Sequence, residues 1–348
     1  MKAGKTVILS ALALALAAVQ SFAAAAPGYH LLKEVTLGGA GGWDYLTVDA
    51  AARRVYISHG THVVVVDADT YAVVGDIPDT LGVHGIALAG AQGFISAGKA
   101  DSVVVFDTTT LKAVSTVPAG KNPDCLIYDP ASAMAFAFNG KSHDATAISA
   151  AALKAQPPLA LPGKPEFAVA DGNGHVYVNM EDKGAIAVID SLKAAVTAQW
   201  NIAPCESPSG LAMDGANRRL FAACDNKMMA VVDADTGRVV ATLPTGDETD
   251  AAAFDPGSGL AFSSNGEGTL TVIREDSADK FSVAENIPTR EGARTMALDT
   301  KTHNVFLVTA KFKEADAKDA NGHQRPQAIP GTFSLLVYGP AAAPAEQK

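Results

Sequence analysis

The chain has 348 residues, 27 of them basic and 37 acidic, and its formal net charge is -10. Apolar residues make up 48% and charged residues 18%, which is typical of a folded protein with a sizeable core rather than a disordered one. The acidic balance and the low aromatic content of 6% argue against nucleic-acid binding, which needs a basic face or a set of stacking rings.

The first 25 residues have the pattern of an export signal. Lys2 and Lys5 precede the apolar stretch 7–19, and Ala23 and Ala25 fit a cleavage site. The alternative is a membrane anchor, but the stretch is too short for a comfortable span, and no later apolar run reaches about 18 residues. We therefore expect a signal peptide over residues 1–25, a periplasmic or secreted mature protein and no membrane span.

Short apolar runs that end in aspartate recur from residue 46 onward. The markers are 40 to 44 residues apart and indicate seven repeats, at Asp49, Ala89, Asp129, Asp171, Asp214, Asp255 and Asp299. Each repeat contains further short runs rich in Val, Ile, Phe and Tyr, separated by turn residues, which is typical of strands. Four short strands in about 42 residues form one blade of a β-propeller. We predict an all-β fold, a single seven-bladed β-propeller over residues 29–339.

The two ends of the repeat region predict how the ring closes. The last repeat stops after its third strand, 333–338, and the segment 31–36 before the first full repeat resembles a fourth strand. The N-terminal strand should therefore complete the last blade and leave few exposed strand edges. Residues 311–332 are an insertion loop in blade seven, and residues 340–348 are expected to form a disordered tail. In four repeats a second aspartate marker, such as Asp67, follows the first by 18 or 19 residues. Repeats three and six have Ser149 and Arg274 in its place, which predicts weaker turns there.

The repeat resembles that of the YVTN-type (YncE-like) seven-bladed β-propellers, which are exported proteins. The segments that carry the resemblance are 49–70, 176–179 and 214–237. It covers residues 29–339 and implies the architecture and export, but no particular activity, because propellers host binding proteins and enzymes alike.

Three cysteines are present, Cys125, Cys205 and Cys224, and none forms a C-x-x-C motif. A zinc ribbon, a redox pair and an attached haem are therefore not indicated. Cys205 and Cys224 are candidates for a disulfide in an oxidising compartment, worth about 3 kcal/mol in the chain-entropy model. Cys125 is expected to be a buried small apolar side chain.

The strongest signal for a functional site is a polar column within the apolar pattern. Five residues before each marker, where each innermost strand begins, every side chain is polar or ionisable: Asp44, His84, Asp124, Glu166, Ser209, Asp250 and Arg294. The innermost strands of a propeller line its central channel. We therefore expect these seven residues to ring one mouth of the channel as a ligand-binding site.

Asp124 and Glu166 are the only adjacent like charges in this ring. They should share a proton, hold a cation or find a basic partner, and Lys121 and Lys164 precede them as candidate partners. With the hydroxyl of Ser209 they would offer hard oxygen donors suited to Ca²⁺ or Mg²⁺.

The sequence leaves three functional classes open. The ring binds a small ligand, a divalent cation or a partner protein; or it is a metal-dependent hydrolase of lactonase type, with His84 as the candidate general acid or base; or its charges only tie neighbouring blades together in a scaffold. We expect a monomer. His59 is expected to be a solvated turn residue on the ring face. The insertion, which carries Lys311, Lys313, His323 and Arg325, should emerge on the same face as a lid or an inert loop.

Overall fold

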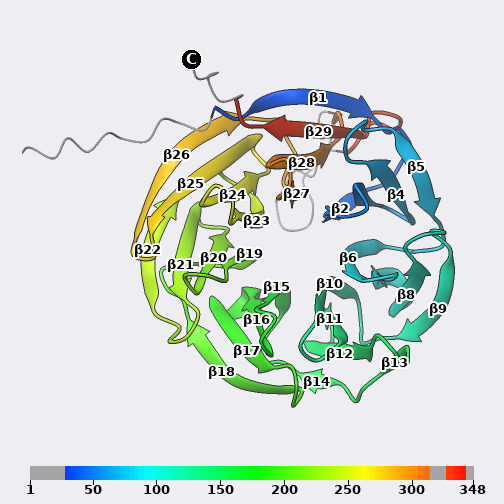
Figure 1. Ribbon diagram of the computed structural model, residues 1–348, viewed down its shortest axis with the longest axis horizontal. Coiled ribbons are helices and arrows are strands. Elements are labelled where there is room, and N and C mark those ends of the chain that lie inside the picture. Colours follow the sequence, from blue (N-terminus) through cyan, green and yellow to red (C-terminus); the bar gives the residue numbers. More distant parts are fainter. Residues whose placement is uncertain (1–27, 314–326, 342–348) are drawn as a thin grey trace, which may run out of the picture.

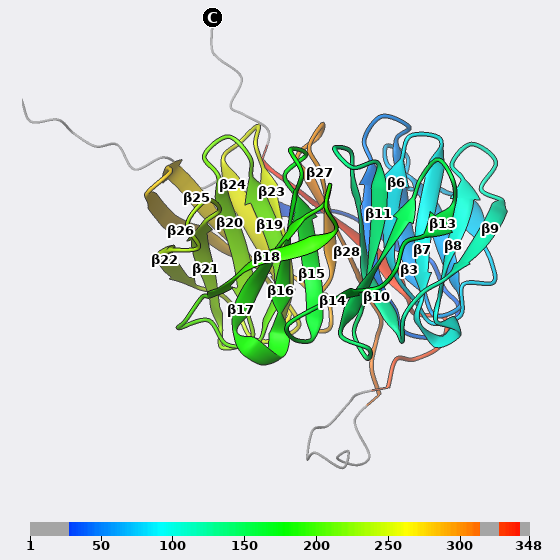
Figure 2. The same ribbon diagram turned by 90° about the horizontal axis from the view of Figure 1, so that it is seen from below.

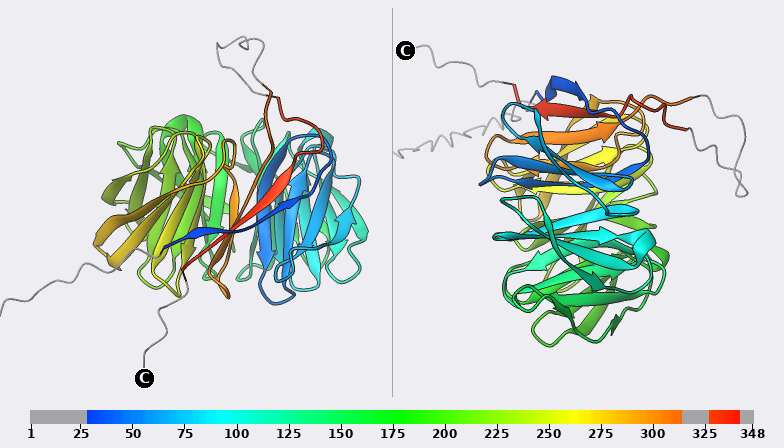
Figure 3. Two further views of the ribbon diagram at one scale, coloured as in Figure 1. Left: turned by 90° about the horizontal axis from the view of Figure 1, so that it is seen from above. Right: turned by 90° about the vertical axis from the view of Figure 1, so that its right-hand side faces the viewer.

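Seven β-sheets stand around a central channel in the computed structural model, which describes residues 28–313 and 327–341 (Figure 1). The predicted signal peptide, the middle of the insertion and most of the predicted tail lie outside these residues. Seen from the side, the ring is a thick disc with two faces (Figures 2 and 3). The prediction of a seven-bladed β-propeller is confirmed. No helix in the described part of the chain is long and apolar enough to cross a membrane.

Each blade takes consecutive strands from the channel outward. Blades one and two contain β2 (Trp43–Asp49), β3 (Arg54–His59), β4 (His62–Asp67), β5 (Val73–Ile77), β6 (Val83–Ala89), β7 (Gln92–Ala97), β8 (Ser102–Asp107) and β9 (Ala113–Pro118). Blades three and four contain β10 (Pro123–Asp129), β11 (Met134–Asn139), β12 (Asp144–Ser149), β13 (Lys154–Ala155), β14 (Leu159–Ala160), β15 (Pro165–Ala170), β16 (His175–Met180), β17 (Ala185–Asp190) and β18 (Ala195–Asn201).

The remaining blades follow the same order. Blades five and six contain β19 (Pro208–Asp214), β20 (Arg219–Cys224), β21 (Met228–Asp233), β22 (Val239–Pro244), β23 (Thr249–Asp255), β24 (Leu260–Asn265), β25 (Thr269–Ser277) and β26 (Lys280–Pro288). Blade seven contains β27 (Met296–Asp299), β28 (Asn304–Thr309), β29 (Ser334–Gly339) and β1 (His30–Thr36). Two single-turn 3₁₀ helices, η1 (Gly98–Ala100) and η2 (Glu181–Lys183), join second strands to third strands in blades two and four.

The ring closes through its two chain ends. The N-terminal strand β1 pairs antiparallel with β29, from His30 opposite Gly339 to Thr36 opposite Ser334. In Figure 1 this strand is the outermost one of the blade whose other strands come from the end of the chain. The expected closure of blade seven is thereby confirmed, because β1 joins the start of the propeller to its end.

Blades three and six differ from the others at their outer edges. In blade three the outer strand is split into β13 and β14, each two residues long, and Pro157 and Pro158 lie between them, where a proline cannot donate to the ladder. In blade six β25 and β26 are each nine residues long. In blade three Ser149 takes the place of the second aspartate marker, and its hydroxyl accepts a hydrogen bond from the Ala152 N–H at 3.2 Å.

The apolar side chains of the strands pack between neighbouring blades. Tyr56 of blade one, for example, contacts Phe106 of blade two with ring centroids 5.6 Å apart, and both are fully buried. The buried residues form seven such clusters in the described chain. The core is therefore a ring of interblade contacts, with no single centre, and the channel is left to the edges of the innermost strands.

The marker aspartates close the hairpins on one face of the disc. In each, a buried or half-buried carboxylate accepts backbone N–H groups two or three residues ahead, as Asp129 does from Ser132 at 3.0 Å. Asp299 also forms an ion pair with Arg53 at 2.8 Å, which links the hairpin of blade seven to that of blade one. These aspartates are turn residues, and they lie at the end of the channel opposite to the polar ring.

Cys205 and Cys224 form a disulfide, with Cα atoms 5.5 Å apart. Cys205 lies in the connection between blades four and five, and Cys224 ends β20 of blade five. The bond therefore ties an interblade connection to the following blade. Cys125 is free and buried in β10, beside the mouth residue Asp124.

Candidate functional site at the channel mouth

The seven polar positions lie where the innermost strands begin. In blades one to six the register between the first and second strands shifts at this point, for example between Trp43 and Leu46 and between Pro123 and Leu126. Such a bulge re-aims a side chain out of the regular alternation. In blade seven Arg294 directly precedes β27. The repeated irregularity explains why these positions are polar although their strands are largely apolar.

Buried polar side chains of the second strands hold this irregular backbone from behind. Ser58 accepts the Asp44 N–H at 2.8 Å, and Ser96 accepts the Gly85 N–H at 2.7 Å and donates to the Asp124 carbonyl at 2.6 Å. Asn179 donates to the carbonyl of Ser209 at 2.8 Å, and Ser264 donates to that of Arg294. The mouth is therefore built on a rigid, hydrogen-bonded support, as a preorganised binding site requires.

Three residues from blades one to three converge at the mouth. The Nδ1 atom of His84 lies 2.5 Å from Oδ2 of Asp44 and 3.6 Å from Oδ1 of Asp124. One donor atom from each of the three residues lies within 4.8 Å of the other two. The side chains are 27%, 19% and 18% exposed for His84, Asp44 and Asp124, so all three remain accessible to solvent. We call this group the Asp–His–Asp cluster.

The mouth carries more negative charge than its basic groups neutralise. Burial and the neighbouring Asp44 charge raise the pKa of Asp124 to about 7, against the opposing effect of His84. Burial and the Asp124 charge likewise raise the pKa of Glu166 to about 8. For His84, burial favours the neutral ring, but the hydrogen bond with Asp44 and the charge of Asp124 outweigh it and raise the pKa to about 9. His84 is therefore an imidazolium near neutral pH.

A lysine beside Glu166 reduces the repulsion between Asp124 and Glu166, the like-charge pair predicted from the sequence. Lys164 Nζ lies 2.8 Å from Oε1 of Glu166 and also pairs with Glu181. The prediction for Lys121 is wrong, because it pairs with Asp101 at 2.6 Å instead. Glu166 is not part of the Asp–His–Asp cluster, so the structure groups Asp124 with His84 and Asp44 rather than with Glu166 as donors for an ion.

The other half of the ring has a different chemistry. The Ser209 hydroxyl donates to the backbone carbonyls of Thr249 and Asp250, at 2.9 and 3.1 Å, and fixes the neighbouring blade. Arg294 Nε donates to Oδ2 of Asp250 at 2.6 Å. Burial raises the pKa of Asp250 to about 6, although Arg294 opposes the shift. On this side of the mouth the Asp250 carboxylate is therefore paired with a permanent cation, whereas on the other side Asp44 and Asp124 share one imidazolium.

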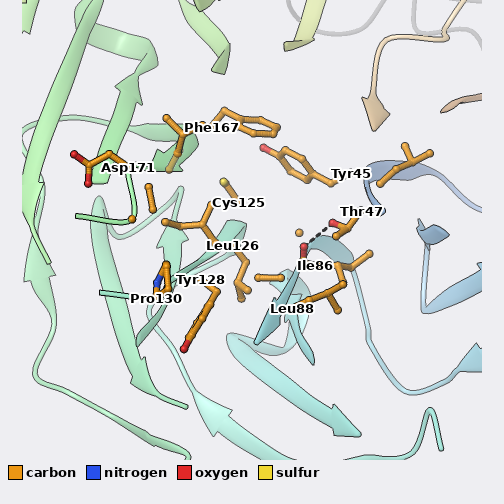
Figure 4. Close-up of a pocket in the computed structure, with 18 residues that line it drawn as sticks. Tyr45, Thr47, Ile86, Leu88, Cys125, Leu126, Tyr128, Pro130, Phe167 and Asp171 are labelled. Atoms are coloured by element: carbon orange, nitrogen blue, oxygen red, sulfur yellow. Dashed lines mark hydrogen bonds between the residues drawn. The ribbon is translucent and has the colours of Figure 1, made fainter. Parts of the chain in front are cut away.

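Sequence reasoning missed two aromatic residues below the ring. Tyr45 and Phe167 point toward one another across the channel, with ring centroids 5.1 Å apart (Figure 4). They line a cavity of about 580 Å³ that continues along the channel past Thr47, Leu126 and Val169. Burial and the charge of Asp124 raise the pKa of the Tyr45 hydroxyl. A signal was present, since the equivalent position of the other repeats holds only Gly, Cys, Ala or Thr.

The expectation for His59 is also wrong. It is 2% exposed in β3 and stacks on Phe333, with ring centroids 4.2 Å apart. Burial, with a smaller effect of His62, lowers its pKa to about 4. Gly39 covers the ring, because a Cβ there would come within 2.6 Å of Cε1 of His59. His59 is thus a neutral core residue that supports the glycine-rich segment before β2.

The base of the insertion, residues 311–313 and 327–332, projects from one face of the disc (Figures 2 and 3). This is the face of the ring, because β28 is antiparallel to β27 and ends where β27 begins. Phe312 forms a bridge with Ala328, and Lys313 N donates to the Gln327 carbonyl at 2.9 Å. Lys311 and Lys313 are exposed there. His323 and Arg325 lie outside the described residues, so the lid stays a prediction.

Comparison with solved structures identifies the class of protein. The chain is similar to "Kuenenia stuttgartiensis Hydrazine Synthase", with a TM-score of 0.66 and 15% identity over 78% of this chain and 94% of that one. It is also similar to "Structure of U3-55K" and "Crystal structure of RRP9 WD40 repeats", each with a TM-score of 0.71 and 8% identity over 90% of this chain, and over 99% and 98% of those chains. At such identities the likeness shows the fold alone. The molecule is a seven-bladed β-propeller.

No family model and no curated protein matches the sequence. Function must therefore be argued from the site itself, since propellers with this ring of blades carry unrelated activities.

Proposed function

We propose that this propeller is a binding protein whose channel mouth takes a divalent first-row metal ion, such as Mn²⁺ or Zn²⁺, at the Asp–His–Asp cluster. One observation carries the proposal: a single donor atom from each of Asp44, His84 and Asp124 lies within 4.8 Å of the other two. Two carboxylates and one imidazole from three strands are a common ligand set for these ions, and solvent would complete the coordination.

The donor set favours these ions over the Ca²⁺ or Mg²⁺ expected from the sequence. That expectation rested on oxygen atoms of Asp124, Glu166 and Ser209, but Glu166 pairs with Lys164 and the Ser209 hydroxyl donates to backbone. The cluster instead includes a ring nitrogen of His84 as a donor. Imidazole suits Mn²⁺ or Zn²⁺ better than the hard alkaline-earth ions.

Ion binding would replace a proton. His84 is protonated near neutral pH and its Nδ1–H hydrogen-bonds Asp44 at 2.5 Å, a separation too short for two ligands of one ion. The ion would therefore displace this proton and move the carboxylate outward by a few tenths of an ångström. It would also relieve the repulsion that raises the pKa of Asp124.

The same protonation argues for binding rather than hydrolysis. In the lactonase-type alternative His84 would act as general base, but its raised pKa keeps the ring charged near neutrality. A general acid is compatible with that state, so the hydrolase would need its base elsewhere. The remaining candidate bases of the mouth are carboxyls with raised pKa values, but Asp124 would be a ligand of the ion and Glu166 pairs with Lys164.

Isothermal titration of the chelator-treated protein with MnCl₂ or ZnCl₂ tests the proposal. We expect one ion per chain, and proton release that makes the heat depend on the ionisation enthalpy of the buffer. His84→Gln and Asp124→Asn should each weaken binding at least about tenfold, or about 1.4 kcal/mol. Asp101→Asn is the matched control, because this acid pairs with Lys121 and is not one of the three ligands. Equal affinity in all four proteins would overturn the proposal.

We also propose that the protein is exported, to the periplasm or beyond, and that it belongs with the YVTN-type propellers. The disulfide between Cys205 and Cys224 supports an oxidising compartment, as does the signal-like pattern of residues 1–25. Expression of the full chain with cell fractionation and N-terminal sequencing tests export. A product that starts at Met1 and stays in the cytoplasm would contradict it.

The expected monomer also stays a prediction, which light scattering of the purified protein can check.

A further inference from the structure

A second hollow lies beside the ring, between blades one and seven. It has a volume of about 420 Å³ and lies between the glycine-rich segment before β2 and the base of the insertion. Its walls include Gly42, Trp43, Gly292, Arg294, Phe312 and Ala328. It shares no residue with the Asp–His–Asp cluster, so what it binds is argued independently of the metal ion.

One wall of this hollow is aromatic and fixed in place. Trp43 packs on Phe333, with ring centroids 5.4 Å apart, and on Phe312 at 6.0 Å. Gly292, with φ of +75°, lies under the Phe312 ring, and a Cβ at this position would approach the ring to 2.5 Å. Trp43 and Phe312 are only half-buried, so they offer one apolar surface to a ligand.

The other wall offers a guanidinium with unused donors. Arg294 Nε donates to Asp250, and the side chain is 48% exposed. Its two terminal nitrogens form no hydrogen bond or ion pair with any other residue of the described ranges. The planar fork of an arginine matches a carboxylate through two parallel hydrogen bonds.

The surrounding charge limits which anion fits. Asp250, Asp44 and Glu248 all act electrostatically on Arg294. A doubly charged phosphate would be repelled by these carboxylates, whereas a single carboxylate of a ligand meets the remaining donors at lower cost. The aromatic wall beside Arg294 then favours a flat apolar body on the same molecule.

We propose that this hollow is a binding site for a small monoanionic carboxylic acid with an aromatic ring, held by Arg294 and packed against Trp43 and Phe312. The ligand's carboxylate lies on the terminal nitrogens of Arg294, and its ring covers the exposed surface of the aromatic wall. The mouth of the propeller thus has an acidic side for a metal ion and a separate side for an organic acid.

Tryptophan fluorescence of the full chain gives a direct test, because the protein has only two tryptophans. Trp200 lies far from the hollow, against Tyr177 in blade four, so Trp200→Phe leaves Trp43 as the reporter. Benzoate should change the emission saturably. Acetate, which lacks the ring, should bind at least about tenfold more weakly, and benzylamine, which lacks the carboxylate, should produce no saturable change.

Two variants separate the carboxylate contact from the shape of the hollow. Arg294→Gln should weaken benzoate at least about tenfold, and Ala328→Phe should weaken it by filling the hollow without touching the arginine. Arg290→Gln is the control, since Arg290 is exposed and pairs with Glu34 outside the hollow. Circular dichroism checks that each variant is folded.

Three results would overturn the proposal: no saturable response to benzoate, equal responses to benzoate and benzylamine, or unchanged affinity in Arg294→Gln. The titrations are done in chelator and repeated with the metal ion, so failure of this site and failure of the Asp–His–Asp cluster are seen separately.

Discussion

The innermost strands carry aspartates at both ends, and the two ends have opposite roles. At the hairpin end the side chain of Asp299 is fully buried, accepts hydrogen bonds from Thr302 and the Lys301 N–H, and pairs with Arg53. At the mouth end Asp124 is 18% exposed, and its one ionic partner among the described residues is His84 at 3.6 Å, which is held more closely by Asp44. At the hairpin end the aspartate carboxylate therefore has close hydrogen-bond and ionic partners. At the mouth end two carboxylates compete for one imidazolium.

The pKa shifts of the two ends have opposite signs. Burial alone would raise the pKa of Asp299, but the hydrogen bonds from Thr302 and Arg53 outweigh it and lower the pKa. At Asp124 burial and the charge of Asp44 prevail and raise it. Asp299 therefore stabilises the fold at neutral pH, whereas Asp124 costs stability there and leaves charge available to a ligand.

The largest expected effect follows from removing a hairpin aspartate. Asp299→Ala leaves the Arg53 guanidinium without its buried partner and two turn donors unsatisfied, so we expect a loss of about 3 kcal/mol in the free energy of unfolding. Because the folded pKa of Asp299 is lowered, its contribution is present above about pH 4 and is lost as the pH falls through the folded pKa. Urea titration at pH 7 and pH 3 measures both.

Asp69→Ala is the matched control for this variant, because Asp69 pairs with the same arginine at 2.7 Å but is 57% exposed. We expect little change, because an exposed ion pair is screened by solvent. If both variants lost the same free energy of unfolding, the buried ion pair between Arg53 and Asp299 would not be the stabilising contact between blades one and seven.

The second prediction concerns the mouth in the presence of an ion. An ion at about 100 times its dissociation constant should stabilise the chelator-treated protein by about 2.7 kcal/mol, which raises Tm by several degrees. Thermal melts with Mn²⁺ or Zn²⁺ check this, and Asp124→Asn should abolish the shift. A shift that persists in this variant would place the ion elsewhere.

The third prediction is that Asp124→Asn stabilises the protein without an ion. The folded pKa of about 7 lies above the usual value, so the folded state holds a proton that the unfolded state has already lost. The cost of Asp124 is absent below about pH 4, grows as the pH rises toward 7 and is constant above it. Since the carboxyl is partly exposed and shares its charge with neighbours, we expect a gain of about 1 kcal/mol at pH 8.

Melts of the two proteins in chelator at pH 4 and pH 8 test this sign. The difference should be negligible at pH 4 and positive for the variant at pH 8. A variant that is less stable than the parent protein at pH 8 would mean that Asp124 belongs with the satisfied aspartates of the hairpin end.

The fold could be predicted from the sequence because its cause is local and repeated. Each marker aspartate signals a hairpin turn, the spacing of 40 to 44 residues signals a blade, and the missing fourth strand of the last repeat signals closure by the N-terminus. The split outer strand of blade three was not predicted, although Pro157 and Pro158 were visible in the sequence.

The candidate site could be predicted only as a ring. Repeat position gives the height of Asp44, His84 and Asp124 in the channel, but the convergence of two carboxylates on one imidazole depends on bulges and rotamers, which no spacing encodes. Trp43 and Phe312 lie near opposite ends of the propeller sequence and meet only through the base of the insertion, so their contact had no local signal. Tyr45 and Phe167 were visible as exceptions to their repeat position and were overlooked.

The smallest effect distinguishes the two lysines that precede the acidic side of the mouth. Lys164 lies between Glu166 and Glu181, and these hydrogen bonds hold its pKa above the usual range despite burial, so Lys164→Ala leaves two acids facing each other. We expect a loss of up to about 1 kcal/mol at pH 8 and a further rise in the pKa of Glu166, measurable by carboxyl NMR titration. Lys121 is 72% exposed and pairs with Asp101, so Lys121→Ala should change stability by less than about 0.5 kcal/mol and leave the Glu166 titration unmoved. Equal changes in stability and in the Glu166 titration would show that the contact between Lys164 and Glu166 has no specific effect. The charge of the mouth would then depend only on the net charge of the surrounding surface.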